Sequence, residues 1–259
     1  MKIAISGKGG VGKTMLASSL STIFARSGYS VLAIDADPNA NLALALGFPQ
    51  PEKIIPISEM SDLIEERTGA RPGERGVYFK LNPKVSDIPE KYWVEHDGIR
   101  LIVMGRLRRG GSGCYCPENA LLEALVAHLL LQRDELIIMD MEAGVEHLGR
   151  GTARAVDKMI IVVEPSKRSV DTAFRIMDLA RDLGLGNIGV VGNKVRGERD
   201  KDFLISSMAG FEFLGFIPYD QAIVEADLAG VSLVNSSQKV MDEVKNIAAR
   251  LGKVEGGRN

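Results

Sequence analysis

A glycine-rich stretch near the start of the chain, Gly7-Lys-Gly-Gly-Val-Gly-Lys-Thr14, constrains the fold more than any other feature. It fits the pattern G-x-x-x-x-G-K-[ST], in which backbone N–H groups and a lysine surround the phosphates of a nucleotide. The apolar run Ile3–Ser6 precedes it, and apolar residues at helical spacing follow it in Thr14–Arg26. Because a strand, a glycine turn and a helix in this order are the context that the pattern requires, the stretch predicts a phosphate-binding loop.

The rest of the chain alternates between short apolar runs and amphipathic stretches. Runs without polar alternation are typical of strands covered on both faces, so we expect a doubly wound, mainly parallel α/β sheet with helices on both faces. The expected strands are Ile3–Ser6, Val31–Ile34, Leu101–Met104, Leu136–Met139, Met159–Val163, Ile188–Val191 and Phe213–Ile217. The expected helices are Thr14–Arg26, Glu118–Leu131, Ser169–Leu183 and Gln238–Leu251.

We expect the whole chain, residues 1–259, to form one P-loop domain. The stretch 48–97 is rich in proline and charge and contains one helical pattern, Ile57–Arg67. It is interpreted as an excursion within the domain and not as a second domain. The glycine loop begins too early to leave room for a secretory signal, and no apolar run is long enough to span a bilayer. We therefore expect a cytoplasmic protein.

Polar side chains at the expected strand ends predict a magnesium site beside the phosphates. Lys13 is expected to reach the β- and γ-phosphates, and the Thr14 hydroxyl is expected to hold Mg²⁺. Val31–Ile34 is followed by Asp35 and Asp37, and Leu136–Met139 is followed by Asp140. Ligands of open parallel sheets bind beyond the carboxyl ends of the strands, where these acids lie. Asp140 and Asp35 are therefore candidates for the magnesium site, although Asp35 and Asp37 are also suited to a turn or a helix cap.

The second lysine in the loop, Lys8, identifies a more specific resemblance. The stretch KGGVGKT resembles the deviant phosphate loop of the family that includes MinD, the ParA partition ATPases, the arsenite-pump ATPase and the nitrogenase iron protein. The resemblance implies a homodimer that closes over two ATP molecules, with Lys8 reaching the phosphates bound by the other subunit. A cation delivered in this way stabilises charge on the transferring phosphoryl group. The alternative is a solvated lysine near the phosphates.

The same resemblance implies roles for residues along nearly the whole chain. Asp37 matches the aspartate that orients or activates the attacking water, and Asp140–Gly144 matches the second switch. Asn193-Lys194 matches the segment whose asparagine reads the base, and Phe216–Asp220 matches the wall of the adenine pocket. The resemblance thus predicts an ATP hydrolase whose catalytic residues are Lys8, Lys13 and Asp37. The expected ATP-binding residues are Gly9, Gly10, Val11, Gly12, Lys13, Thr14, Asn193, Lys194, Pro218, Tyr219 and Asp220.

The only two cysteines, Cys114 and Cys116, predict a metal site shared between two chains. In an extended chain, residues two apart point to the same side about 6.6 Å apart, so both thiolates can bind one soft metal. A closed site usually needs four ligands, which a twofold dimer supplies. Four thiolates suit Zn²⁺, Ni²⁺ or an iron–sulfur cluster. The alternative is a pair of thiols that bind nothing.

The segment Cys114-Tyr-Cys-Pro117 together with MEAGVEHLGRGT resembles the nickel-insertion ATPases of carbon monoxide dehydrogenase maturation, the CooC type. This resemblance implies a client, either carbon monoxide dehydrogenase or the related acetyl-CoA synthase. The nitrogenase iron protein takes one cluster ligand from its second switch. Here Asp140–Arg150 contains no cysteine, which argues against a cluster of that design. The alternative function of this kind is an electron-transfer reductase that carries an iron–sulfur cluster.

A MinD- or ParA-like spatial-organisation ATPase is the other alternative. A MinD-like protein needs a membrane-binding C-terminal helix, whereas Gln238–Leu251 has modest apolar residues and mixed charge. A formal net charge of −2 gives no sign of a surface for nucleic acid. We therefore expect neither a membrane nor a nucleic-acid partner. Roles are left open for an acidic switch residue, for a histidine that senses nucleotide or contacts metal, and for arginines that dock an acidic client or lie in a solvated loop: Glu142, His147, Arg106, Arg108 and Arg109.

Overall fold

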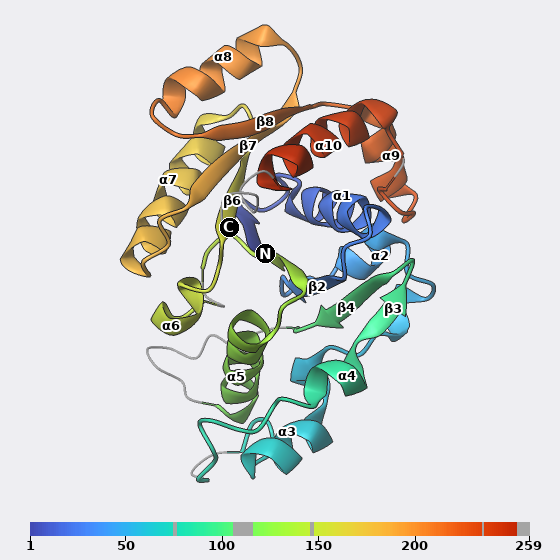
Figure 1. Ribbon diagram of the computed structural model, residues 1–259, viewed down its shortest axis with the longest axis vertical. Helices are drawn as coiled ribbons and strands as arrows, with labels where there is room; N and C mark the ends of the chain where they lie inside the picture. Colours follow the sequence, from blue (N-terminus) through green and yellow to red (C-terminus); the bar gives the residue numbers. More distant parts are fainter. Residues whose placement is uncertain (75–76, 106–115, 146–147, 235, 253–259) are drawn as a thin grey trace.

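The computed structural model describes residues 1–74, 77–105, 116–145, 148–234 and 236–252. Its centre is an eight-stranded sheet in the order β3-β4-β2-β5-β1-β6-β7-β8 (Figure 1). The strands are β1 (Lys2–Gly7), β2 (Val31–Ala36), β3 (Val94–His96), β4 (Ile99–Val103), β5 (Leu136–Met141), β6 (Lys158–Val163), β7 (Ile188–Val195) and β8 (Phe213–Pro218). Every neighbouring pair is parallel except β3 with β4.

Helices cover both faces of this sheet, which confirms the expected doubly wound fold (Figure 1). The α-helices are α1 (Lys13–Arg26), α2 (Leu42–Leu46), α3 (Ser61–Thr68), α4 (Ile88–Tyr92), α5 (Pro117–Gln132), α6 (Arg150–Ala153), α7 (Lys167–Asp182), α8 (Glu198–Ser207), α9 (Gln221–Leu228) and α10 (Gln238–Gly252). Short 3-10 turns lie at Pro51–Lys53 and Ile57–Glu59. No helix of the described residues combines the length and apolarity needed to cross a bilayer.

The strands divide the core into two layers because successive side chains point to opposite faces. Ile3 and Ile5 of β1 pack with α1 and α10, whereas Ala4 between them packs with α5 and α7. Each buried strand therefore supplies apolar residues to both layers, which explains why its sequence is a continuous apolar run. In Figure 1, α1 and α10 lie on one side of the sheet and α5 and α7 on the other.

All the expected strands are present, but β3 was missed. It forms a hairpin with β4 around Asp97 and Gly98, which both have positive φ, 48° and 73°. An Asp-Gly pair favours this type of two-residue turn, so the sequence carried a signal for the hairpin. The expected helix Ile57–Arg67 is also corrected to a 3-10 turn followed by α3. The Ser58 N–H donates to the Met104 carbonyl beside β4, which holds the turn against the sheet.

Candidate active site

The glycine loop joins β1 to α1 near the middle of the sheet. β2, β4 and β5 lie on one side of β1, and β6, β7 and β8 lie on the other. Gly12 precedes α1 with φ 99°, a left-handed conformation that strains other residues. A Cβ on Gly12 would lie 2.1 Å from Asn193 Nδ2. The glycine is therefore required both by the turn and by the side chain that packs against it.

Lys13 and Thr14 occupy the first turn of α1, where the helix has free N–H groups and a partial positive charge. Lys13 is 6% exposed, and its Nζ lies 3.8 Å from Asp37 Oδ2. The Asp37 Oδ1 atom accepts the N–H of Asn39, which orders the turn after β2. The cation, the helix terminus and the carboxylate thus lie together, and their role in binding phosphate stays a prediction.

Asp140 lies behind this point and suits a magnesium ion. Its Oδ2 accepts the Thr14 hydroxyl at 2.6 Å, and its Oδ1 is buried with no hydrogen-bond partner among the described residues. An orphaned buried carboxylate oxygen beside a hydroxyl is the kind of oxygen donor set that Mg²⁺ prefers. Burial raises the pKa of Asp140 to about 8, and the charge of Asp35 adds to the rise. A divalent cation here would offset both effects.

Asp35 is opposite Asp140 in the pairing of β2 with β5, but its oxygens already have partners. Oδ1 accepts the N–H of Asp37 at 3.2 Å, and Oδ2 accepts the N–H of Leu42 at 2.8 Å. Burial raises the pKa of Asp35 to about 6, although these backbone N–H groups oppose the rise. The side chain therefore fixes the turn that carries Asp37. Its contribution to the magnesium site stays a prediction.

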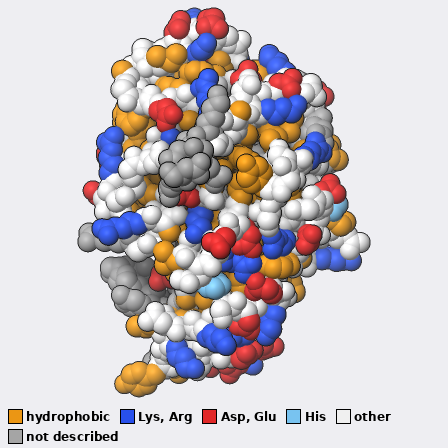
Figure 2. Space-filling model, viewed as in Figure 1, with side chains coloured by type: hydrophobic (Ala, Val, Ile, Leu, Met, Phe, Trp, Pro, Cys, Tyr) orange, Lys and Arg blue, Asp and Glu red, His pale blue; other side chains and the backbone are white. Residues whose placement is uncertain are grey.

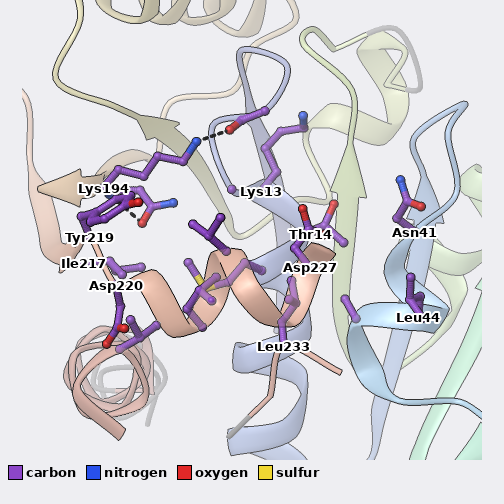
Figure 3. Close-up of a pocket in the computed structure, with 18 of the residues that line it drawn as sticks. Lys13, Thr14, Asn41, Leu44, Lys194, Ile217, Tyr219, Asp220, Asp227 and Leu233 are labelled. Atoms are coloured by element: carbon purple, nitrogen blue, oxygen red, sulfur yellow. Dashed lines mark hydrogen bonds between the residues drawn. The ribbon is translucent and has the colours of Figure 1, made fainter. Parts of the chain in front are cut away.

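A pocket of about 570 Å³ opens along the glycine loop (Figure 3). Lys194, Tyr219 and Asp220 stand at one end of it, and Asn41 and Leu44 stand at the other. The predicted residues that line it are Gly9, Gly10, Gly12, Lys13, Thr14, Asp37, Asn193, Lys194, Pro218, Tyr219 and Asp220. The structure thus brings most of the predicted nucleotide residues to one cavity. Val11, Asp35 and Asp140 are fully buried beside it, with 0% exposure.

The residues predicted for the adenine end also brace the loop. Asn193 and Lys194 lie inside β7 and not after it. Asn193 Nδ2 donates to the Val11 carbonyl at 2.7 Å, and Lys194 Nζ donates to the Gly10 carbonyl at 2.7 Å. Asp220 caps α9 by accepting the Ala222 N–H, and it accepts the Ser237 hydroxyl. Direct contact of these side chains with a base stays a prediction.

Lys8 pairs with the residue that follows β6, whereas the second switch, Asp140–Gly144, begins at the end of β5 on the other side of β1. Lys8 Nζ donates to Glu164 Oε1 of the same chain at 3.0 Å. The Ser6 hydroxyl lies 2.9 Å from the carbonyl oxygens of Glu142 and Gly144, which ties the second switch to β1. His147 lies outside the described residues.

The cysteine segment is described only in part. Cys116 is half-buried and immediately precedes α5, whereas Cys114, Arg106, Arg108 and Arg109 lie outside the described residues. Within the described ranges, no cluster of three or more His, Cys, Asp or Glu side chains is arranged to hold a metal.

Sequence reasoning missed the apolar side of the pocket and the carboxylate that holds Lys8. Further lining residues come from α2, α9 and the segment between α9 and α10: Leu44, Ala45, Ile223, Val224, Val231 and Leu233. No pattern marks them, because segments far apart in the chain bring them together. Glu164 did carry a signal, since it is a charged residue directly after an apolar run, at the ligand-binding edge of the sheet.

The family model for the CobQ/CobB/MinD/ParA nucleotide-binding domain matches residues 2–234. An uncharacterized ATP-binding protein of Methanocaldococcus jannaschii is 48% identical, over 97% of this chain and 98% of that protein. The carbon monoxide dehydrogenase accessory protein CooC of Rhodospirillum rubrum is 46% identical, over 99% of each chain. The resemblances found in the sequence, to this family and to CooC, are therefore confirmed.

Solved structures show the same fold. MinD of Aquifex aeolicus has a TM-score of 0.68 at 22% identity, with 98% of each chain covered. MinD of Pyrococcus horikoshii, complexed with Mg-ADP, has a TM-score of 0.66 at 20% identity, with 98% of this chain and 97% of that one covered. The chain thus has the fold of these MinD structures. The chain is a member of the CobQ/CobB/MinD/ParA nucleotide-binding family and an ATPase of that family.

Proposed function

We propose that this ATPase is a cytoplasmic, magnesium-dependent homodimer that inserts nickel into carbon monoxide dehydrogenase or the related acetyl-CoA synthase. The similarity to the accessory protein CooC carries the proposal, because 46% identity extends over 99% of both chains. The fold by itself does not distinguish this function from division or partition, since one ATPase core serves many purposes. The Cys114-Tyr-Cys116 pair adds chemistry that suits a soft metal.

ATP binds along the loop with its phosphates at the start of α1. The loop N–H groups and Lys13 hold the phosphate oxygens. Thr14 and Asp140 would hold magnesium, which would neutralise charge on the phosphates. The segments Asn193–Lys194 and Pro218–Asp220 accommodate the base, together with apolar residues that line the same pocket. This assignment is supported by the open cavity beside the loop and by the unpartnered Asp140 Oδ1 among the described residues.

Hydrolysis requires a positioned water and a cation near the terminal phosphate. Asp37 lies beside Lys13 at the pocket wall, which suits it to orient the attacking water. Lys8 supplies positive charge to the nucleotide of the partner subunit, so that each site is complete only in the closed dimer. An isolated chain therefore hydrolyses ATP slowly.

The cysteine pair holds the cargo metal at the twofold axis, with two thiolates from each chain. Nickel or zinc fits four thiolates, and nickel is the metal delivered. Cys116 immediately precedes α5, which leads through β5 to the second switch at Asp140–Gly144, so movement of that switch can reach the pair. By linkage, nucleotide state and metal affinity change one another by the same factor.

Metal analysis tests this site directly. We expect one nickel or zinc ion per two chains in the native protein, and dimerisation promoted by the metal without ATP. The variant Cys114→Ser/Cys116→Ser should lose both, while Ser206→Ala, at an exposed position on α8, should lose neither. If the cysteine variant still bound one metal ion per two chains, the metal site would not be at Cys114 and Cys116. Equal metal affinity with ADP and with ATP would sink the coupling to hydrolysis.

The membrane-associated alternative has no support from the C-terminal helix. The apolar face of α10 is buried in the core next to α1, with its apolar residues at Val240, Val244, Ile247, Ala248 and Leu251. Figure 2 shows acidic and basic side chains interspersed over the face that it displays. Neither observation favours a lipid or nucleic-acid partner over a protein client.

A further inference from the structure

The Glu164 carboxylate joins two lysines on either side of the glycine loop. Its Oε1 accepts a hydrogen bond from Lys8 Nζ at 3.0 Å, and its Oε2 lies 3.6 Å from Lys194 Nζ. Lys194 Nζ also donates to the Gly10 carbonyl inside the loop. One oxygen of the Glu164 carboxylate therefore contacts Lys8 of the loop, and the other lies near Lys194, which braces the loop at Gly10.

The backbone around Glu164 is fixed, so the carboxylate has little freedom to move away. The residue follows the buried Val163 at the carboxyl end of β6. Its N–H donates to the Ser169 hydroxyl at 3.1 Å, and Ser169 is buried in the first turn of α7. The Ser166 hydroxyl also lies 3.4 Å from Glu164 Oε1. The carboxylate is thus presented to Lys8 by a strand end and a helix start.

The contact is a real counter-ion interaction of moderate strength. The side chains of Lys8 and Glu164 are 36% and 21% exposed, so water screens the pair only in part. Burial by itself would raise the pKa of Glu164. The hydrogen bond and charge of Lys8, together with the charge of Lys194, outweigh burial and hold that pKa below its usual value. The carboxylate is therefore ionised at neutral pH and available to both lysines.

This arrangement conflicts with the role proposed for Lys8 in the dimer. A lysine ammonium that pairs with Glu164 of its own chain cannot at the same time place its charge on the phosphates of the partner. We propose that Glu164 is a positioning residue that holds Lys8 in the isolated chain, so that Lys8 must leave Glu164 to enter the partner's site. The inference rests on the proposed function in one respect, the action of Lys8 in trans.

The exchange makes closure conditional on nucleotide. Without ATP in the partner, leaving Glu164 exposes the lysine to water with no new counter-ion. With ATP bound, the phosphates supply a stronger one, because they carry more charge than a single carboxylate. Lys194 stays with Glu164 and the loop, so the carboxylate keeps a cation after Lys8 leaves. Glu164 thus opposes closure of the empty dimer and sets how much protein is needed for ATP-dependent closure.

The test is dimerisation of the Glu164→Gln variant, which keeps the shape of the side chain and removes its charge. Mass in solution is measured against protein concentration, with Mg²⁺ and a non-hydrolysable ATP analogue, after bound transition metal has been stripped. The dimer dissociation constant should fall about three- to thirtyfold, because each of the two chains no longer gives up a partly screened ion pair. ATPase activity per chain should reach its plateau at a correspondingly lower protein concentration.

Two further variants make the result specific. Asp242→Asn removes the carboxylate of an exposed ion pair on α10, in which Asp242 Oδ1 lies 3.1 Å from Lys245 Nζ. This variant should leave the dimer dissociation constant unchanged. In Lys8→Ala/Glu164→Gln the gain should vanish, because it acts through Lys8. An unchanged or larger constant for Glu164→Gln, or the same gain in the Lys8→Ala background, overturns the inference. Full ATPase activity of Lys8→Ala alone would overturn the trans role of Lys8 and not the contact with Glu164.

Discussion

The residue pair that most affects the properties of the site is Asp35 with Asp140, two buried carboxyls on neighbouring strands. The pairing of β2 with β5 puts them side by side, and neither is exposed to water. Asp35 gains backbone hydrogen bonds, whereas Asp140 keeps one oxygen without a partner among the described residues. Ionising Asp140 in the free protein is therefore unfavourable, and a bound divalent cation would offset that cost.

The first prediction concerns Asp140→Asn in protein freed of nucleotide and magnesium. The pKa of Asp140 rises from its ordinary 3.8 to about 8 in the folded protein. Between these two values the unfolded chain has lost the proton that the folded chain keeps, so raising the pH favours unfolding. The Asp140→Asn variant does not lose stability in this way, because an amide does not titrate. Its free energy of unfolding should exceed that of the native protein by on the order of 1–3 kcal/mol at pH 8 and by less near pH 5.

Denaturant unfolding in the presence of a chelator measures this difference at each pH. Titrating groups that do not interact with Asp140 cancel in the comparison, because both proteins contain them; Asp35, which interacts with Asp140, adds to the difference. A difference that does not change between about pH 5 and 8 would show that Asp140 is already ionised in the free protein. The same variant should lose magnesium-dependent hydrolysis, since an amide oxygen is a weaker magnesium ligand than a carboxylate.

The second prediction concerns Lys13→Ala. The lysine is buried beside the loop, and its charge-assisted contacts with two phosphates each contribute roughly 1.5–3 kcal/mol. Affinity for ATP should fall about a hundredfold or more. Titration calorimetry with ATP and magnesium measures it, with Lys53→Ala as a control that removes an exposed lysine of the 3-10 turn. Unchanged ATP affinity of Lys13→Ala would remove the basis of the phosphate site.

At the scale of elements, the segment 48–97 is joined to the sheet by buried apolar residues and by the pairing of β3 with β4, and side-chain pairs add to these contacts. Arg67 at the end of α3 donates two hydrogen bonds to Asp87, at 2.9 and 2.8 Å, just before α4. The Trp93 ring, just after α4, lies under two guanidinium groups. Cζ of Arg100 in β4 is 4.8 Å from the ring centroid, and Cζ of Arg133 is 5.6 Å from it. Planar guanidinium groups suit both contacts. The Arg67–Asp87 pair therefore links α3 to the start of α4 within the segment, in addition to the buried apolar residues that hold it.

The third prediction is that Asp87→Asn loosens this segment and leaves nucleotide binding intact. The Arg67 hydrogen bonds hold the pKa of Asp87 well below its usual range, so the pair stabilises the segment above about pH 4 and is lost as the pH falls. Limited proteolysis should cut the variant about two- to fivefold faster within 69–87 at neutral pH. Asp62→Asn, which removes an exposed carboxyl 3.5 Å from Arg71, is the control. Equal cutting of native protein and Asp87→Asn would show that the pair does not restrain the segment.

The elements that sequence reasoning found are those with long, unambiguous patterns. β1, β2, β5 and β6 are continuous apolar runs, and α1 follows a glycine loop with a known context. Short helices were missed because one or two turns give too few residues for a period: α2 has five residues and α9 has eight. Both line the pocket, so the sequence predicted the phosphate loop and the segments Asn193–Lys194 and Pro218–Asp220, and it did not predict the apolar residues of α2 and α9.

In the whole molecule, two chains are needed to complete each ATP hydrolysis site. The fourth prediction is that inactive Lys8→Ala and inactive Asp37→Ala regain activity when mixed. In the mixed dimer one site combines native Asp37 with native Lys8 from the partner, while the other site lacks both. Random exchange makes about half of the dimers mixed, so activity should recover to about a quarter of the native value. No recovery, with mixed dimers demonstrated by mass, would mean that Lys8 and Asp37 of one chain act in the same site, which contradicts the action of Lys8 in trans.

The proposed function is tested most directly by activating nickel-free carbon monoxide dehydrogenase from the same organism. The dehydrogenase is incubated with Ni²⁺, Mg²⁺ and this protein, and carbon monoxide oxidation is measured over time with ATP or with a non-hydrolysable analogue. We expect the dehydrogenase to be activated faster only with ATP and native protein. Lys13→Ala and Cys114→Ser/Cys116→Ser should match the rate without the protein. Activation that is equally fast with the analogue, or with either variant, would contradict nickel insertion driven by ATP hydrolysis.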